Sequence, residues 1–127
     1  MIELLVARTP AGEFIGQRLT TAQTLDAPRI LDAEVISALL GLLRGKKITE
    51  KEADTALAGY RAFPLDRHDI LPLWPRIKSL HANLSAYDAQ YVALAEALRV
   101  PLVTADARIE RSGAARCAIE VFGAPKP

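Results

Sequence analysis

The sequence predicts a single α/β domain with a mainly parallel sheet flanked by helices on both faces, and three observations support this fold class. Short apolar stretches of strand length alternate with amphipathic stretches of ten or more residues, as is typical of such folds. Half of the 127 residues are hydrophobic, which is enough to build one core. The sequence contains no internal repeat, low-complexity tract or linker. One domain over residues 1–127 is therefore expected.

The first 30 residues predict two short helices followed by a strand. The turn sequence Thr9-Pro10-Ala11-Gly12 separates the helices, because proline and glycine interrupt a helical pattern. Pro28 follows the strand. The expected ranges are Ile2–Arg8 and Glu13–Leu19 for the helices and Thr24–Ala27 for the strand.

The next stretch predicts a helical hairpin. Asp32 has the position of an N-cap before a strongly apolar helix, which Gly45 ends. Thr49 and Glu52 have the spacing of a capping box, which begins a second helix. The expected helices are Ala33–Arg44 and one that reaches about Ala62.

The second half of the chain predicts three strands and two longer helices. A strand that contains Pro64 is expected at a sheet edge, because proline is poorly tolerated inside a sheet. Asp69 has the cap position of a helix with Pro72 in its first turn, and Ser85 caps the next helix. The expected strands are Phe63–Arg67, Pro101–Thr104 and Ala118–Phe122, and the expected helices run from Asp69 to about Ala82 and over Tyr87–Leu98.

Charge and composition exclude several classes of protein. Sixteen Lys and Arg residues nearly balance fifteen Asp and Glu residues, so any affinity for nucleic acid must come from a local patch. The longest apolar stretch, Val35–Leu43, is far shorter than the roughly 20 residues that span a bilayer. The N-terminus lacks the basic region of a signal peptide, and the single Cys117 cannot form an internal disulfide. A cytoplasmic protein is expected.

Three acidic residues are expected to meet at one edge of the sheet. Asp88 begins an apolar helix that climbs ~15 Å to Leu98, and the strand before Asp106 returns ~16 Å in the opposite sense. Both acids therefore lie at the carboxyl edge of the sheet, where open α/β proteins bind their ligands. Glu34 belongs there as well, since it lies in the first turn of the helix that follows a strand.

This cluster of carboxylates favours a divalent metal. Closely packed carboxylates repel one another unless a cation lies between them, and hard oxygen ligands favour Mg²⁺ or Mn²⁺. Thr104 points to the same side of its strand as Asp106 and places a hydroxyl beside it. Structural roles also remain open: Asp88 fits a capping box with Ser85, Glu34 suits a helix dipole, and Asp106 suits the N-cap of a short helix.

Three motifs surround these acids. They are Leu31-Asp32-Ala33-Glu34-Val35, then His81-Ala82-Asn83-Leu84-Ser85-Ala86-Tyr87-Asp88-Ala89 with Tyr91-Val92-Ala93-Leu94-Ala95, then Leu102-Val103-Thr104-Ala105-Asp106. In order and spacing they resemble PIN-domain ribonucleases, and more closely the VapC toxins of bacterial toxin–antitoxin pairs. The resemblance covers residues 1–127.

The resemblance implies a function and a site. Glu34, Asp88 and Asp106 map onto three of the family's four acidic positions and would be the catalytic and metal-binding residues. Such enzymes use Mg²⁺ or Mn²⁺ to activate water against an RNA phosphodiester. The family also implies a homodimer and a VapB-type antitoxin that binds a groove between helices. The residues expected to line the site and bind substrate are Thr104, Ser85 and Asn83.

One departure from the family pattern affects these expectations. The family begins with a central strand that ends in an Asp, whereas here Met1 falls where the first helix is already expected. The first strand and first acid are therefore expected to be missing, and the sequence suggests a natural start upstream or a shortened form. Two alternatives to the enzyme follow: a catalytically silent module that binds antitoxin or RNA, and a phosphoacceptor domain, for which no suitable lysine is found.

Other residues carry weaker hypotheses. A surface or hydrogen-bonded role is expected for His68 and His81, and packing beside Leu73 and Ile77 for Trp74. Tyr87 is a candidate for stacking on RNA bases. Surplus apolar residues on the early helices suggest either an interface or core packing; they are Leu4, Leu5, Phe14, Ile15, Ile36, Leu39, Leu40 and Leu43.

Overall fold

The computed structural model describes residues 2–3, 25–104 and 107–121 and contains a five-stranded parallel sheet. Every neighbouring pair of strands runs parallel, in the order β3-β2-β1-β4-β5. The predicted α/β class with a parallel sheet is therefore confirmed. The strands are β1 (Ile2–Glu3), β2 (Leu25–Pro28), β3 (Leu65–His68), β4 (Leu102–Thr104) and β5 (Ile119–Val121).

The strand β1 corrects the expectation of a helix that begins at Ile2. Ile2 lies opposite Asp26 of β2 and Leu102 of β4, and Glu3 lies opposite Val103. The middle of the sheet is thus occupied, and the gap expected there is absent from the described part of the chain. Two neighbouring strands offer backbone partners on both sides, which outweighs a local helical pattern this short. The rest of that expected helix and the helix expected at Glu13–Leu19 lie outside the described residues.

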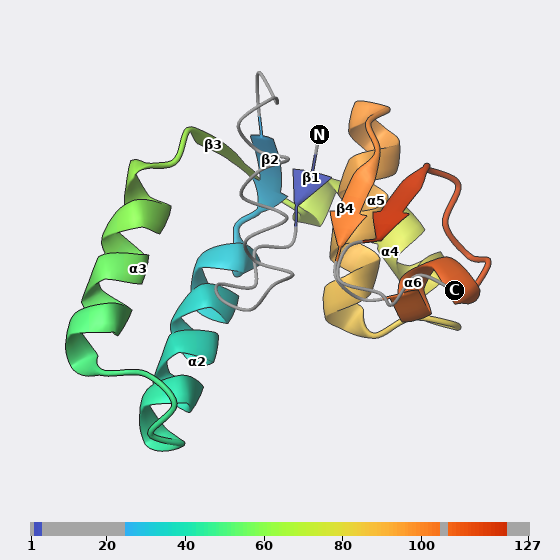
Figure 1. The fold of residues 1–127 in the computed structure, drawn as a ribbon. Coiled ribbons are helices and arrows are strands. Elements are labelled where there is room, and N and C mark those ends of the chain that lie inside the picture. The colour runs from blue at the N-terminus through green and yellow to red at the C-terminus, as the bar shows by residue number, and fades with distance from the viewer. Residues whose placement is uncertain (1, 4–24, 105–106, 122–127) are drawn as a thin grey trace.

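The helices α2 (Ile30–Arg44) and α3 (Glu50–Ala62) form the predicted hairpin. The capping box of Thr49 and Glu52 is confirmed, with hydrogen bonds of 2.9 and 3.1 Å between each side chain and the other residue's backbone N–H. Figure 1 shows this hairpin projecting beside β2 and β3. The first helix of the hairpin, α2, begins at Ile30, whereas the sequence predicted a start at Ala33.

Asp32 is consequently not the N-cap of α2. Arg29 occupies the cap position with helical backbone angles and makes no side-chain cap hydrogen bond. Asp32 lies in the first turn, where its carboxylate binds side chains from α3 and β3 instead. Glu34 in turn lies beyond the first turn, so the expected helix-dipole position is also wrong.

The single helix expected from Asp69 to Ala82 is divided in two. A 3-10 turn, η1 (Leu71–Leu73), precedes α4 (Trp74–Leu80), which has Pro75 in its first turn. Proline has no N–H to donate, so it fits the first turn of a new helix and not the interior of a longer one. Asp69 forms an exposed ion pair with Arg29 at 2.6 Å.

The helix α5 (Ala86–Leu98) is the centre of the core and agrees with the predicted helix. It packs against β1, β2 and β4, and α6 (Ala107–Arg111) lies beside β5. Arg99 ends α5 with a left-handed backbone, φ 57°. The buried residues of α5 are Ala89, Tyr91, Val92, Ala93, Leu94 and Ala95.

The remaining expectations have mixed outcomes. His68 and His81 make the expected hydrogen bonds, to the Asp26 carboxylate at 2.7 Å and to a backbone carbonyl at 3.1 Å. The packing expected for Trp74 is wrong, because 57% of this residue is exposed and the Lys78 ammonium lies 5.8 Å from the ring centre. Within the described residues, no helix is both long enough and apolar enough to cross a bilayer.

Candidate active site

Glu34 lies where α2 faces α5. The buried stripe of α2 comprises Leu31, Val35 and Leu39, and Glu34 stands next to it, half-buried. The hydroxyl group of Tyr91, a fully buried residue of α5, donates a hydrogen bond to Oε1 of Glu34. This contact connects two helices at a position that water reaches only in part.

The environment of Glu34 perturbs its ionisation. Burial and the negative charge of Asp88 raise the pKa of the Glu34 carboxyl group, and the hydrogen bond from Tyr91 opposes this rise. The two carboxylates therefore lie close enough to act on each other. Burial and the bond to Glu34 likewise raise the pKa of Tyr91, so its phenol stays protonated and donates.

Asp88 lies in the first turn of α5, beside a helix cap. The Ser85 hydroxyl accepts a hydrogen bond from the backbone N–H of Asp88 at 3.1 Å. The cap thus uses the backbone of Asp88, so helix capping and a role for the carboxyl group in a site are compatible. Ser85 and Asn83 are exposed just before this helix, at the same end of α5 as Asp88.

The remaining predicted site residues follow β4. Thr104 ends this strand and is fully buried. Asp106, the third predicted acid, lies outside the described residues. No group of three His, Cys, Asp or Glu side chains suited to a metal ion occurs within the described ranges. The charge of Asp88 thus acts on Glu34, while the shared metal site of these two acids and Asp106 stays a prediction.

A second polar cluster borders this pair. The Arg67 guanidinium binds both oxygens of Asp32, at 2.8 Å from Nε and 2.9 Å from Nη2, and the Tyr60 hydroxyl donates to the same carboxylate at 2.7 Å. Arg67 lowers the pKa of Asp32, while burial and Asp32 raise that of Tyr60. Tyr60 also contributes to the raised pKa of Tyr91. The cluster joins α2, α3 and β3 next to the candidate site.

Tyr91 and this cluster are what reasoning from sequence missed. Asp88 and Tyr91 share one face of α5, a signal visible in the sequence as a spacing of three. Tyr91 donates to Glu34, which lies 57 positions away in the sequence, and Asp32 accepts from Arg67, which lies 35 positions away. No local pattern indicates such pairs.

A hollow of about 490 Å³ opens beside Glu34. Its described walls come from the first half of α2 and the start of α5, and Glu34 is the acid among its described lining residues. Most of these walls are apolar. The described lining residues are Ile30, Ala33, Glu34, Ser37, Ala38 and Tyr87.

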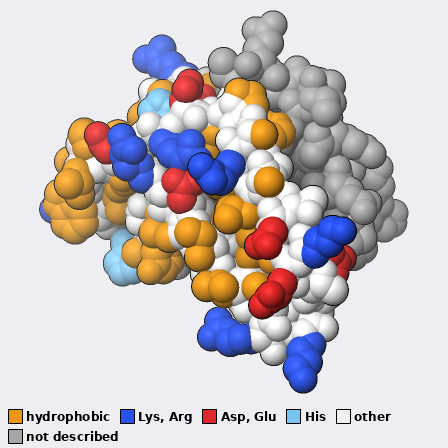
Figure 2. Space-filling view, turned by 90° about the vertical axis from the view of Figure 1, so that its left-hand side faces the viewer, with side chains coloured by type: hydrophobic (Ala, Val, Ile, Leu, Met, Phe, Trp, Pro, Cys, Tyr) orange, Lys and Arg blue, Asp and Glu red, His pale blue; other side chains and the backbone are white. Residues whose placement is uncertain are grey.

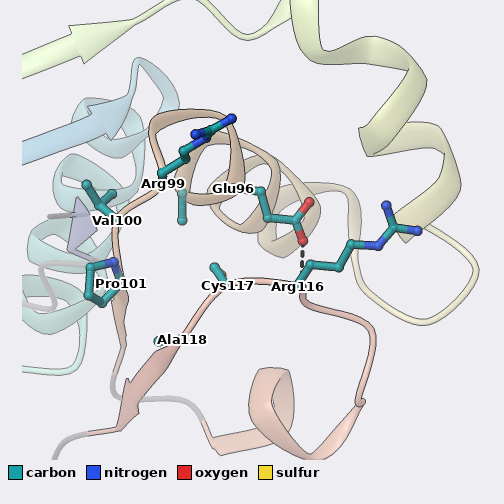
Figure 3. Close-up of a pocket in the computed structure, with 8 residues that line it drawn as sticks. Glu96, Arg99, Val100, Pro101, Arg116, Cys117 and Ala118 are labelled. Atoms are coloured by element: carbon teal, nitrogen blue, oxygen red, sulfur yellow. Dashed lines mark hydrogen bonds between the residues drawn. The ribbon is translucent and has the colours of Figure 1, made fainter.

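A larger hollow, of about 620 Å³, lies at the other end of α5 (Figure 3). Figure 3 shows the residues that line it: Glu96 of α5, Arg99 just after this helix, and Pro101 and Ala118 just before β4 and β5 begin. It therefore lies at the amino ends of these strands, whereas ligands of open parallel sheets bind at the carboxyl ends. Burial raises the pKa of Cys117 in its wall, so the thiol is not an activated nucleophile.

Comparison with known proteins adds to this geometry. Residues 1–114 match the family model of the PIN domain. The chain is 41% identical to VapC ribonuclease Mb0985 of Mycobacterium bovis over 106 residues, 84% of each chain. It is 33% identical to Ribonuclease VapC12 of Mycobacterium tuberculosis, over 94% of this chain and 92% of that one. The crystal structure of PAE2754 from Pyrobaculum aerophilum is similar in fold, with a TM-score of 0.71 and 20% identity, over 94% of this chain and 88% of that chain.

Proposed function

This chain belongs to the PIN-domain family, and from that premise we propose that it is a VapC-type endoribonuclease, the toxin of a type II toxin–antitoxin pair. It hydrolyses RNA: the oxygen of a water molecule bonds to phosphorus while one P–O bond of the backbone breaks. The observation that carries the proposal is the hydrogen bond from Tyr91 to Glu34, which fixes the Glu34 carboxyl group of α2 against α5, the helix that carries Asp88. Relatives named as ribonucleases, up to 41% identical, support it.

We further propose that the activity depends on Mg²⁺ or Mn²⁺. The described donors fit such an ion, because Glu34 and Asp88 are hard oxygen ligands whose mutual repulsion a cation relieves. These two residues, together with Asp106, would hold it. When bound, the ion supplies an acidified water molecule and neutralises charge on the phosphate.

The residues around the acids have positioning roles in this proposal. Tyr91 holds Oε1 of Glu34, and among the described residues no side chain or backbone group donates to Oε2. One oxygen of Glu34 is thereby oriented, and the other is left for the ion or a water molecule. We propose that Ser85 and Asn83, which are exposed just before α5, contact the substrate, whereas Thr104 is fully buried and would act from behind the acids.

The proposed partners are a second copy of the chain and a VapB-type antitoxin. On the face that Figure 2 shows, hydrophobic side chains reach the surface in groups, with charged side chains beside them. Ile36 and Leu40 are 49% and 52% exposed and lie four residues apart on one side of α2. An exposed apolar stripe of this kind is typical of an interface. We propose that the antitoxin binds α2 at its exposed apolar residues Ile36 and Leu40.

A ribonuclease assay with matched variants tests the function. The purified chain, freed of antitoxin, is incubated with total RNA and Mg²⁺ or Mn²⁺, beside Asp88→Asn and Asp54→Asn. Asp54 is an exposed acid of α3 and serves as the control. We expect cleavage by the wild type and the control, and a loss of roughly 100-fold or more in Asp88→Asn.

Two outcomes contradict the proposal. Cleavage that survives in Asp88→Asn means that the acids are not the site. Absence of cleavage from every variant, when the freed chain still rebinds antitoxin added back to it, identifies the chain as a silent binding module.

A further inference from the structure

We infer that the hollow beside Glu34 is a subsite for one unpaired nucleobase of the RNA, with the ring of Tyr87 as its stacking surface. This inference rests on the proposed function, since it places the base next to the phosphodiester that water would attack at the acids. The lining of the hollow and the exposure of Tyr87 carry it.

The position of Tyr87 is unusual for an aromatic residue. It directly precedes Asp88 in the first turn of α5, and 55% of it is exposed although it lines the hollow. Glu34 lines the same hollow from α2. The ring of Tyr87 and the carboxylate of Glu34 thus line one opening, and Asp88 directly follows Tyr87 in the chain.

The walls of the hollow suit a nucleobase better than a phosphate. Ile30, Ala33 and Ala38 present apolar surface, and Ser37 adds one hydroxyl that can bond to the edge of a base. Glu34 would repel a phosphate that entered the hollow, whereas a base carries no charge. Proteins that bind single-stranded RNA commonly stack unpaired bases on aromatic side chains.

An apolar segment of the antitoxin is the competing occupant. Such a segment would cover the half-buried Glu34 carboxylate without supplying charge to it, which is costly. A nucleobase stacked on Tyr87 instead offers amino or imino N–H groups that can donate to the Glu34 carboxylate, which an apolar side chain cannot do. The charge in the wall therefore favours RNA over an apolar peptide.

Trp74 provides a matched control, because it is the other aromatic side chain among the exposed large hydrophobic residues of the described chain. It lies on α4 beside Lys78 and is absent from the described lining of the hollow. Its removal deletes an exposed ring of similar accessibility without touching the proposed subsite.

The test measures RNA binding in an Asp88→Asn background, which prevents cleavage during titration. Fluorescein-labelled decamers of adenylate, of uridylate and of abasic ribose phosphate are titrated by fluorescence anisotropy. We expect Tyr87→Ala to weaken binding of the two base-containing decamers by roughly 10-fold and to leave abasic binding unchanged. Tyr87→Phe and Trp74→Ala should bind all three probes like the parent.

Three results overturn the inference: Tyr87→Ala binds adenylate and uridylate decamers like the parent, it weakens abasic binding equally, or it loses only the co-expressed antitoxin. Thermal unfolding of each variant verifies that it is folded. Cleavage by the protein with Asp88 intact is measured separately. If that protein does not cleave RNA but Tyr87→Ala still loses base-dependent binding, the subsite stands and the catalytic function fails.

Discussion

Arg76 of α4 binds the carboxylate of Glu96 on α5 through two hydrogen bonds, at 2.7 Å from Nε to Oε1 and 3.0 Å from Nη2 to Oε2. The backbone N–H of Arg116 donates to the same carboxylate at 2.7 Å, and Arg76 also donates to the carbonyl of Ala114 at 3.0 Å. One ion pair therefore joins two helices to the segment that leads into β5. Both side chains are mostly buried, with 22% and 14% exposure.

Acid unfolding tests the contribution of this pair. Burial alone would raise the pKa of Glu96, but Arg76 and the Arg116 N–H lower it below its ordinary value of 4.5. The stabilisation is therefore complete above pH 4.5 and is lost as the pH falls through the lowered pKa. In Arg76→Met we expect the free energy of unfolding at pH 7 to fall by about 2 kcal/mol. Below pH 4.5 the free energy of unfolding of this variant should also change less steeply with pH than that of the wild type.

Urea unfolding followed by circular dichroism between pH 7 and pH 3 measures both effects. Arg61→Met on the exposed side of α3 is the control and should behave like the wild type. An Arg76→Met protein as stable as the wild type at pH 7 would show that solvent screens the pair completely.

Tyr91→Phe tests the positioning of Glu34. The substitution removes one hydroxyl and keeps the buried ring, so Glu34 loses the bond that orients Oε1 and opposes its raised pKa. We expect Mn²⁺ affinity and RNA cleavage to fall about 10-fold each, as is usual when a partner of a metal-binding carboxylate is lost. Mn²⁺ binding is followed by electron paramagnetic resonance, independently of cleavage.

Tyr60→Phe is the comparison for this variant. Its hydroxyl binds Asp32, so we expect it to lower stability and leave Mn²⁺ affinity near that of the wild type. Equal loss of Mn²⁺ affinity in both tyrosine variants would refute a specific role for Tyr91.

Leu40→Lys tests the proposed interface on α2. Leu40 is 52% exposed, so we expect little change in the free energy of unfolding and loss of the co-purified antitoxin. Leu71→Lys, at a position 88% exposed on η1, is the control. Light scattering after size-exclusion chromatography shows whether each variant still carries the antitoxin. If Leu40→Lys retains the antitoxin, the antitoxin does not bind at Leu40.

Local signals predicted much of the fold correctly. The capping box of Thr49 and Glu52, the cap at Ser85 and the stop at Gly45 each involve residues a few positions apart. Such contacts form from the chain's own neighbours, so a short window of sequence contains them. The alternation of strands and helices then predicted the parallel sheet, because parallel strands require crossover connections.

The errors arose where distant partners outweighed local preference. Ile2 and Glu3 form a strand because β2 and β4 lie on either side of them. Asp32 does not cap α2, since Arg67 and Tyr60 bind its carboxylate from β3 and α3. In both cases hydrogen-bond partners from other elements decide the structure.

The sequence by itself determined the order of helices and strands and the spacing that sends Glu34 and Asp88 to one region of the fold. Only the tertiary structure decided that Tyr91 holds Glu34, that Arg67 holds Asp32, and that Tyr87 remains exposed beside a hollow. The physical reason is that periodicity specifies which face of an element is apolar, whereas the partner of a polar group depends on how elements pack.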